Sequence, residues 1–414
     1  MSLRVLVVTP IYPNPEDPQS GIFIHRQIAN LVKQGVKCHV LRYLPAPPPF
    51  PRWLKSRSWV LHHWKHLLRP DEVEGVPVDR VYYQRQWTKD EDVVPLIGAA
   101  LVRHVEEHPE LQQTDAVYAH FLWTGGAAAL SLRERFGWPV AAIARGSEMH
   151  DWHRYHPHCR DQVTRFIREA DCALANCEDL CDRAGEFVPD ATQRMPVIYN
   201  GCDADRFRPT ADKRALRREL GLNENAKLLL FCGTLDERKG VPELTEAWRD
   251  FAAAHTDWQL VMVGRPTEPA LAEHLKAQGH GRVVFTGHIP ADKVLRYMQA
   301  ADAYIQPSRL EGLANATMEA AAVALPVITT DTCGQREVIQ NGVNGWLVAP
   351  ESPVALLQAM NELAADPNRA AQMGQVARKT IKQKFNPTLE AGKLANILQR
   401  LATRREVEIP AAGC

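Results

Sequence analysis

The chain has 414 residues, of which 45% are hydrophobic, so it can bury more than one core and is predicted to hold about two or three domains. Its 49 Lys and Arg residues balance its 49 Asp and Glu residues, so no overall field exists to attract nucleic acid, and a nucleic-acid partner is not expected. Nine cysteines without a C-x-x-C pair favour reduced thiols in a cytoplasmic protein over a disulfide framework or a zinc ribbon.

Strands and helices are predicted to alternate in the N-terminal half. Residues 4–9 (RVLVVT) form a first strand and not a signal peptide, because the apolar run is short and no small-residue cleavage site follows. A polar loop at 10–20, a helix at about 21–34 and a strand at 37–43 complete a βαβ unit. The same pattern continues with strands at 116–120, 139–144 and 172–176. This alternation predicts a largely parallel, doubly wound sheet.

A second α/β series is predicted in the C-terminal half. The turn-rich segment NGCDADRFRP at 200–209 precedes a polar helix at 213–220, which Gly221 ends. The strands that follow are predicted at 227–232, 259–263, 283–287, 303–306 and 326–329. A final helical segment at 387–404 has apolar residues at helical spacing and is expected to pack on a domain face. The predicted fold class is therefore α/β with two doubly wound domains.

Ligands of such sheets bind at the carboxyl ends of the strands, so a cleft between the two domains is the expected site. Neither half has G-x-G-x-x-G after its first strand, and neither contains a Walker-type G-x-x-x-x-G-K-[ST]. The sequence therefore argues against a dehydrogenase and against a P-loop enzyme.

Charged residues follow two strands of the C-terminal half. The loop GTLDERKG after residues 227–232 carries Arg238 and Lys239, which can hold two positive charges over an anion. The segment PSRLEGLANATMEAAA after residues 303–306 carries Glu311 and Glu319 near a helix N-terminus, where N–H groups and the helix dipole favour a phosphate or a sugar hydroxyl. Together they suggest a site for a diphosphate and a ribose; exposed charges on a solvated surface are the alternative interpretation.

In this order, the motifs resemble those of the family-4 glycosyltransferases, retaining nucleotide-sugar enzymes of the GT-B fold. The resemblance extends over nearly the whole chain: it includes GTLDERKG, the E-x7-E element, the linker N-G-x-D-x-x-x-F-x-P at 200–209 and the turn GVNGWLV at 342–348. It implies two Rossmann-like domains facing each other across a cleft. The acceptor-binding domain would comprise 1–198 with a return segment at about 385–414, and the nucleotide-sugar-binding domain would comprise 199–384.

The resemblance also implies roles for individual residues. Lys239 would hold the diphosphate, Glu319 the ribose, and Glu311 with the backbone that follows it the donor sugar, while His120 at a strand end would face the transferred sugar. A core or capping histidine is the alternative for His120. The implied catalytic residues are His120, Arg238, Lys239 and Glu311. The implied donor-binding residues are Gly21, Gly233, Thr234, Gly312, Leu313, Ala314 and Glu319.

Two positions depart from the family pattern. Thr234 stands where many members have an arginine five residues before the lysine, so Arg238 is expected to supply the missing guanidinium, with an exposed surface charge as the alternative. Arg145-Gly146-Ser147-Glu148 stands where His-Gly-x-Asp is common. Arg145 and Glu148 are therefore expected on the acceptor side, with contacts that differ from those of other members.

No metal is expected, because Lys239 and Arg238 can neutralise a diphosphate. Asp203 and Asp205 form a D-x-D, but their place in the turn-rich linker favours a structural turn over metal ligation. Four histidines lie close together without an established ligand spacing, and an acceptor-side surface or solvent exposure is favoured over a metal cluster. They are His150, His153, His156 and His158.

The stretch at 51–69 (PRWLKSRSWVLHHWKHLLR) has five Lys and Arg residues and no acid, with apolar residues at helical spacing. This composition suits an anionic membrane surface carrying a lipid-linked acceptor, and a helix packed on its own domain is the alternative. The longest uncharged run, 116–132, is shorter than the roughly 18–20 apolar residues that span a bilayer. The protein is thus expected to be cytoplasmic, with peripheral attachment to the inner face of the membrane left open.

The function implied is transfer of a sugar from a UDP-, GDP- or ADP-sugar to a hydroxyl of a glycan or lipid-linked acceptor, in cell-surface polysaccharide or glycolipid biosynthesis, without a further cofactor. Two alternatives stay open. One is a nucleotide-sugar epimerase on the same two-domain plan, which needs no acceptor groove. The other is a non-catalytic nucleotide-sugar-binding subunit, against which Lys239, Glu311 and Glu319 argue.

Overall fold

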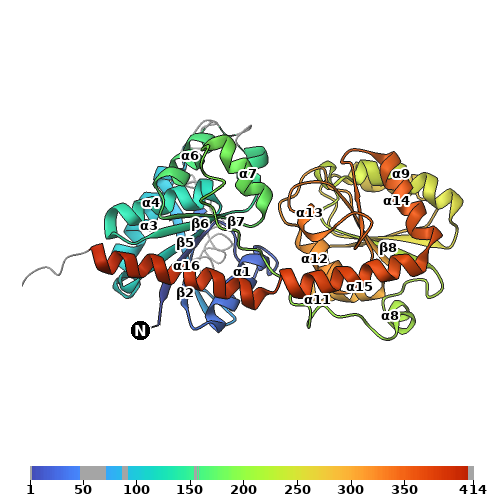
Figure 1. The fold of residues 1–414 in the computed structure, drawn as a ribbon, viewed down its shortest axis with the longest axis horizontal. Helices are drawn as coiled ribbons and strands as arrows, with labels where there is room; N and C mark the ends of the chain where they lie inside the picture. The colour runs from blue at the N-terminus through green and yellow to red at the C-terminus, as the bar shows by residue number, and fades with distance from the viewer. Residues whose placement is uncertain (1, 47–70, 86–91, 153–155, 157, 409–414) are drawn as a thin grey trace, which may run out of the picture. The chain divides into compact units, whose positions relative to one another are not determined.

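The computed structural model describes residues 2–46, 71–85, 92–152, 156 and 158–408. Two compact units make up the chain. The N-terminal unit comprises Met1–Ile198 and Thr388–Cys414, and the C-terminal unit comprises Tyr199–Pro387. Each unit has one sheet with helices packed against it (Figure 1). The end of the chain therefore returns to the unit in which it began.

The sheet of the N-terminal unit has the strand order β3-β4-β2-β1-β5-β6-β7, and its neighbours are parallel except for the antiparallel pair β3 and β4. The strands are β1 (Arg4–Thr9), β2 (Lys37–Pro45), β3 (Asp71–Val73), β4 (Val76–Tyr83), β5 (Ala116–His120), β6 (Val140–Ala144) and β7 (Cys172–Ala175). The α-helices are α1 (Ile22–Lys33), α3 (Val94–Glu107), α4 (Ala127–Phe136), α6 (Cys159–Glu169), α7 (Glu178–Phe187) and α16 (Pro387–Glu408).

The sheet of the C-terminal unit is parallel throughout its described strands, in the order β10-β9-β8-β11-β12-β13. The strands are β8 (Lys227–Cys232), β9 (Trp258–Val263), β10 (Val283–Gly287), β11 (Ala303–Gln306), β12 (Val327–Thr330) and β13 (Trp346–Val348). The α-helices are α8 (Lys213–Glu219), α9 (Val241–Ala254), α10 (Pro269–Gln278), α11 (Ala291–Ala300), α12 (Asn315–Ala322), α13 (Gln335–Val338), α14 (Pro353–Ala365) and α15 (Pro367–Lys384).

The central strands are nearly continuous apolar runs because helices cover both faces of a parallel sheet. Four successive residues of β1, from Val5 to Val8, are at most 2% exposed. The helix α16 joins this core through Leu394 and Leu398, which lie four residues apart on one helix face and are fully buried. Figure 1 shows α16, in red, lying along the N-terminal unit.

The fold class predicted from the sequence is confirmed, and β1, β5, β8, β10 and β11 have the predicted bounds. The prediction missed β3, β4 and β13. Buried and more exposed positions interrupt one another in β4, so it has no continuous apolar run, and β13 has only three residues. Short or partly exposed strands at the sides of a sheet give the least periodic signal.

Three further expectations from the sequence concern membrane-spanning helices, the basic stretch at 51–69 and the cysteines. Among the described residues, no helix is both long enough and apolar enough to cross a bilayer. The basic stretch at 51–69 lies outside the described residues. Of the cysteines that the structure describes, none forms a disulfide and all except Cys172 are buried.

Candidate active site

The loop after β8 carries the first group of candidate residues. It starts at Gly233 and ends in a short 3-10 turn, Glu237–Lys239, directly before α9. The Asp236 carboxylate accepts hydrogen bonds from the Thr234 hydroxyl at 2.6 Å and from the Lys239 backbone N–H at 2.9 Å. Thr234 therefore serves, in the structure, to hold the loop that presents Lys239.

Gly240 joins this loop to α9 and approaches the backbone after β11 very closely. Its φ is +71°, and a Cβ atom at this position would lie 1.9 Å from the carbonyl oxygen of Pro307. Only glycine accepts both the left-handed conformation and the close approach. The packing fixes the Lys239 loop beside the segment that carries Glu311.

Lys239 and Glu311 meet in an ion pair, Nζ to Oε1, with side chains that are only 15% and 11% exposed. The Ser308 hydroxyl also donates to Glu311 Oε1 at 3.0 Å, and the Gln306 amide donates to Ser308 Oγ at 2.7 Å. Burial opposes ionisation of Glu311, but the charge and hydrogen bond of Lys239, with a smaller effect of Arg238, outweigh it and lower the pKa of Glu311. The carboxylate is therefore ionised at neutral pH.

Arg238 is exposed, yet its charge reaches Glu311 strongly enough to lower that pKa. Both Glu311 and Glu319 help to raise the pKa of Tyr304, an increase that comes chiefly from burial, so both carboxylates lie near the carboxyl end of β11. The C-terminal unit thus brings Arg238, Lys239, Glu311 and Glu319 into one region.

The helix α12 begins beside these charges. Gly312 and Leu313 precede it, Ala314 occupies the N-cap position, and Glu319 lies in its second turn. No side chain caps this end of the helix. Backbone N–H groups at a helix start favour anions and hydroxyl oxygens.

The second group of candidate residues lies in the N-terminal unit, where β5 and β6 end. His120 is the last residue of β5, and Arg145 directly follows β6. Arg145 Nη2 lies 2.7 Å from His120 Nδ1 and 2.7 Å from Gln27 Oε1, which also accepts a 2.9 Å hydrogen bond from the Tyr118 hydroxyl. His120 is fully buried, and burial together with Arg145 lowers its pKa well below the usual range.

Glu148 binds the backbone beside the same cluster. Its Oε1 accepts the backbone N–H groups of Arg145 at 3.0 Å and Leu122 at 3.1 Å. Burial raises the pKa of Glu148, although these backbone hydrogen bonds and the charge of Arg145 oppose the shift. Gly21, at the start of α1, has φ +63°, and a Cβ there would lie 2.7 Å from Ile11 O.

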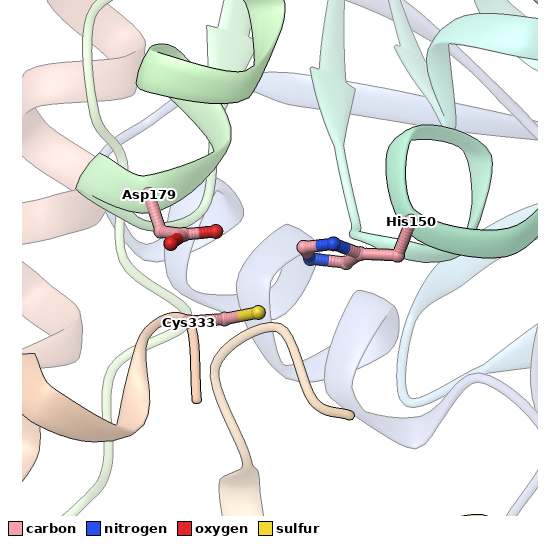
Figure 2. Close-up of side chains that lie close together, drawn as sticks. All are labelled: His150, Asp179 and Cys333. Atoms are coloured by element: carbon pink, nitrogen blue, oxygen red, sulfur yellow. The ribbon is translucent and has the colours of Figure 1, made fainter. Parts of the chain in front are cut away.

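The D-x-D motif of the linker, a possible metal motif in the sequence, forms a turn. Asp203 Oδ1 accepts the backbone N–H groups of Asp205 and Arg206, each at 3.0 Å, as in an Asx turn. Figure 2 shows the His150 ring and the Asp179 carboxylate pointing toward each other within the N-terminal unit. A ring nitrogen of His150 and a carboxylate oxygen of Asp179 lie no more than 4.8 Å apart. Cys333, which Figure 2 also labels, belongs to the C-terminal unit.

The structure places one other histidine of that sequence cluster, His156, against an aromatic ring. His153 lies outside the described residues, and the His156 ring packs on Trp123 with centroids 4.7 Å apart.

Sequence reasoning missed Gln27, Tyr118, Gln306 and Ser308. The signal for Gln306 and Ser308 was present, because both are polar residues placed at the carboxyl end of a buried strand, where ligands of parallel sheets bind. Gln27 and Tyr118 gave no such signal: a glutamine within an amphipathic helix and a tyrosine within a strand are common in cores.

Two family models together match most of the chain. The model described as Glycosyltransferase Family 4 matches residues 20–206, and the model described as Glycosyl transferases group 1 matches residues 212–380. The first match lies almost wholly in the N-terminal unit, and the second lies within the C-terminal unit.

Curated relatives are similar over long stretches. TuaC of Bacillus subtilis, which carries the provisional name of a teichuronic acid biosynthesis glycosyltransferase, is 26% identical over 405 residues, covering 96% of this chain and 97% of TuaC. A GDP-mannose-dependent phosphatidylinositol monomannoside mannosyltransferase of Mycolicibacterium smegmatis is 28% identical over 322 residues, covering 73% of this chain and 80% of the relative.

Solved structures share the fold. Sucrose-phosphate synthase from Thermosynechococcus elongatus superposes with a TM-score of 0.75 at 18% identity, covering 97% of this chain and all of that one. HepE of Anabaena, solved with UDP, superposes with a TM-score of 0.73 at 18% identity, covering 96% of this chain and all of HepE. With both sheets, both family models and these relatives in agreement, the chain belongs to the family-4 glycosyltransferases of the GT-B fold.

Proposed function

We propose that this glycosyltransferase moves a sugar, with retention of configuration, from a nucleotide diphosphate sugar to a hydroxyl of a glycan or lipid-linked acceptor. The observation that carries the proposal is the Lys239–Glu311 ion pair beside the start of α12. The pair provides a cation suited to a diphosphate and a carboxylate suited to sugar hydroxyls. Both lie after the carboxyl ends of β8 and β11, where parallel sheets bind ligands. The division into an acceptor-binding N-terminal domain and a donor-binding C-terminal domain is part of the proposal.

Charge development in the reaction explains the choice of residues. As the sugar leaves, its anomeric carbon becomes positive and the diphosphate gains negative charge, so fixed cations stabilise the transition state more than the ground state. Lys239 and Arg238 have this role in the proposal, and their charges make a metal unnecessary. The leaving phosphate then receives the proton of the incoming hydroxyl on the same face of the sugar, which is what retention requires.

The remaining donor contacts follow the same scheme. Glu319 accepts hydrogen bonds from the ribose hydroxyls, and Glu311 with the backbone of Gly312, Leu313 and Ala314 binds the sugar. Gly233 and Thr234 shape the loop under the diphosphate. In the N-terminal unit, the proposal assigns Gly21 and His120 to contacts with the transferred sugar, and Arg145 and Glu148 to the acceptor side.

The relatives suggest which probes to use. HepE was solved with UDP and with UDP-glucose, and the mycobacterial relative is named for GDP-mannose, so UDP-, GDP- and ADP-sugars are the donors to test. The names of TuaC and the mannosyltransferase support an acceptor in cell-surface polysaccharide or glycolipid biosynthesis. A cytoplasmic protein attached to an anionic inner membrane surface fits such an acceptor.

The test begins with thermal unfolding of the full chain against a panel of UDP-, GDP- and ADP-sugars, because a ligand of the native state raises its apparent stability. The donor that stabilises is then incubated with and without lipid-linked acceptors, and the products are identified by mass spectrometry. Transfer to an acceptor with the anomeric configuration retained is expected. Interconversion of the donor without acceptor would indicate an epimerase instead, and binding without any turnover would indicate a binding subunit.

A further inference from the structure

The contact between Arg145 and His120 determines which ring nitrogen carries hydrogen. A guanidinium has five N–H donors and no acceptor, and it stays protonated in proteins. Arg145 Nη2 lies 2.7 Å from His120 Nδ1, so Nδ1 must accept the hydrogen bond with its lone pair. A neutral His120 then carries its hydrogen on Nε2.

The surroundings of His120 keep the ring neutral. The side chain is fully buried, and the groups that face it are the Arg145 cation and the Tyr118 ring, whose centroid lies 4.8 Å away. Among the described residues, no carboxylate forms a hydrogen bond or ion pair with the imidazole, and Glu148 is bound instead to the backbone N–H groups of Arg145 and Leu122. Burial and the neighbouring cation both lower the pKa of His120.

The position of Arg145 is itself fixed by its other contacts. The same Nη2 donates to Gln27 Oε1 at 2.7 Å, and that oxygen also accepts from the Tyr118 hydroxyl at 2.9 Å. The Arg145 backbone N–H is bound to Glu148 Oε1 at 3.0 Å. Residues from α1, β5 and the segment after β6 therefore hold the guanidinium against His120.

We infer that Arg145 is a positioning residue that locks His120 as the neutral tautomer with hydrogen on Nε2, which makes His120 a hydrogen-bond donor to an oxygen of the bound sugar. The structure gives His120 Nε2 no hydrogen-bond partner among the described residues. The identity of the oxygen as a sugar oxygen rests on the proposed function; the tautomer does not.

This assignment decides what His120 cannot do. With Nδ1 occupied by Arg145 and Nε2 carrying hydrogen, neither nitrogen has a lone pair to accept a proton from an attacking hydroxyl. His120 therefore binds and orients, and the proton leaves by another group.

The test observes the tautomer directly in the full chain labelled with ¹⁵N-histidine, by long-range ¹H–¹⁵N NMR correlation between pH 5.5 and 8. The His120 signals are identified by their loss in His120→Asn. An unprotonated Nδ1 and a protonated Nε2 that do not titrate across this range are expected. A protonated Nδ1, or a ring that becomes cationic within the range, would overturn the inference from the wild-type spectrum alone.

Three substitutions separate positioning from general structural support. Arg145→Met removes the donor and is expected to shift the tautomer ratio toward Nδ1–H by about tenfold, the effect of one ordinary hydrogen bond. Arg145→Lys keeps a donor and is expected to restore the wild-type pattern. Gln27→Met removes one contact that holds the guanidinium but not the donor to Nδ1, so a smaller shift in the same direction than in Arg145→Met is expected. An unchanged tautomer ratio in folded Arg145→Met would contradict the inference.

The NMR result and the proposed function can fail independently, because the spectrum needs neither donor nor acceptor. Once transfer is measured, Arg145→Met is expected to reduce kcat more than it raises KM for the donor, and Arg145→Lys to recover most of kcat. In the wild type, the pH profile of kcat is expected to show no ionisation that His120→Asn abolishes. A profile whose acidic limb disappears in His120→Asn would show that His120 acts as a base.

Discussion

In each unit a cationic side chain lies at the carboxyl ends of the central strands, but its hydrogen-bond partners differ between the two units. In the C-terminal unit, Lys239 is paired with a carboxylate, Glu311, and both side chains retain some exposure. In the N-terminal unit, Arg145 donates to two neutral acceptors, Gln27 Oε1 and His120 Nδ1, and the histidine is fully buried.

The charged partner of Lys239 and the neutral partners of Arg145 suit different functions. An ion pair can exchange its internal carboxylate for an external anion, because one negative charge replaces another beside the same cation. A network of neutral acceptors cannot make that exchange, but it fixes hydrogen positions and ring orientation. We therefore expect substitutions in the C-terminal unit to act through charge, and substitutions around Arg145 to act through tautomer and pH.

The largest effect is expected for Lys239→Ala. Loss of the cation proposed to hold the leaving diphosphate should lower kcat/KM by about 10²–10³-fold, the usual effect of removing one transition-state donor. Steady-state kinetics with the preferred donor measure it, and circular dichroism checks the fold.

Lys227→Ala is the matched control for this substitution. Lys227 lies at the opposite, amino end of the same strand, and its 3.0 Å ion pair with Asp257 is solvent-exposed, so little change is expected. Full transferase activity in Lys239→Ala would remove Lys239 from the catalytic assignment.

The next effect concerns the backbone under Lys239. Gly240→Ala should destabilise the C-terminal unit by roughly 3 kcal/mol or more, because a left-handed conformation and a backbone clash with Pro307 coincide. Gly221→Ala has nearly the same φ, +68°, but nothing lies within 4 Å of its Cβ, so about 1 kcal/mol is expected from the left-handed conformation alone. Urea unfolding of both variants isolates the close approach, and equal losses would show that strain alone acts.

A smaller effect tests the exchange of anions. Glu311→Gln leaves the Lys239 cation without its carboxylate, so UDP or GDP without a sugar should bind about tenfold more tightly, equivalent to about 1.4 kcal/mol. The full donor should gain less, because the substitution also removes the carboxylate proposed to bind the sugar. Isothermal titration calorimetry with both ligands measures the contrast, and weaker binding of the sugar-free nucleotide would contradict the exchange.

Much of the fold was predictable because buried parallel strands are apolar along their length. β1 and β8 were found with their bounds from continuous runs such as RVLVVT and KLLLFC. β4 was not found, since Pro77, Asp79 and Arg80 interrupt its buried positions. Local sequence has no means to show that such a strand pairs with β2.

The candidate site was predictable only where a motif is contiguous. GTLDERKG gives Lys239 and its loop, but its pairing with Glu311 joins residues 72 positions apart. The contact of Arg145 with His120 joins residues 25 positions apart, and Gln27 lies 118 positions from Arg145. Spacing in the sequence has no bearing on such contacts, so the tautomer of His120 could be inferred only from the structure.

The smallest expected effect is a pH dependence at Glu148 in the N-terminal unit. Burial raises the pKa of Glu148 above its usual value of 4.5, so the folded state holds this proton more tightly than the unfolded chain does. Stability is then lost as pH rises from 4.5 through the folded pKa, because the unfolded chain releases the proton first.

Glu148→Gln cannot ionise, and its amide oxygen still accepts the backbone N–H groups of Arg145 and Leu122. The stability of the variant relative to the wild type should therefore increase on going from pH 5 to pH 8, by about 1 kcal/mol or roughly 2–4 °C in Tm. Thermal unfolding at both pH values measures the gain. A difference in Tm that is the same at pH 5 and pH 8 would mean that the Arg145 cation compensates the buried carboxylate fully, and the contrast between the charge-paired and neutral clusters would then be smaller than the geometry indicates.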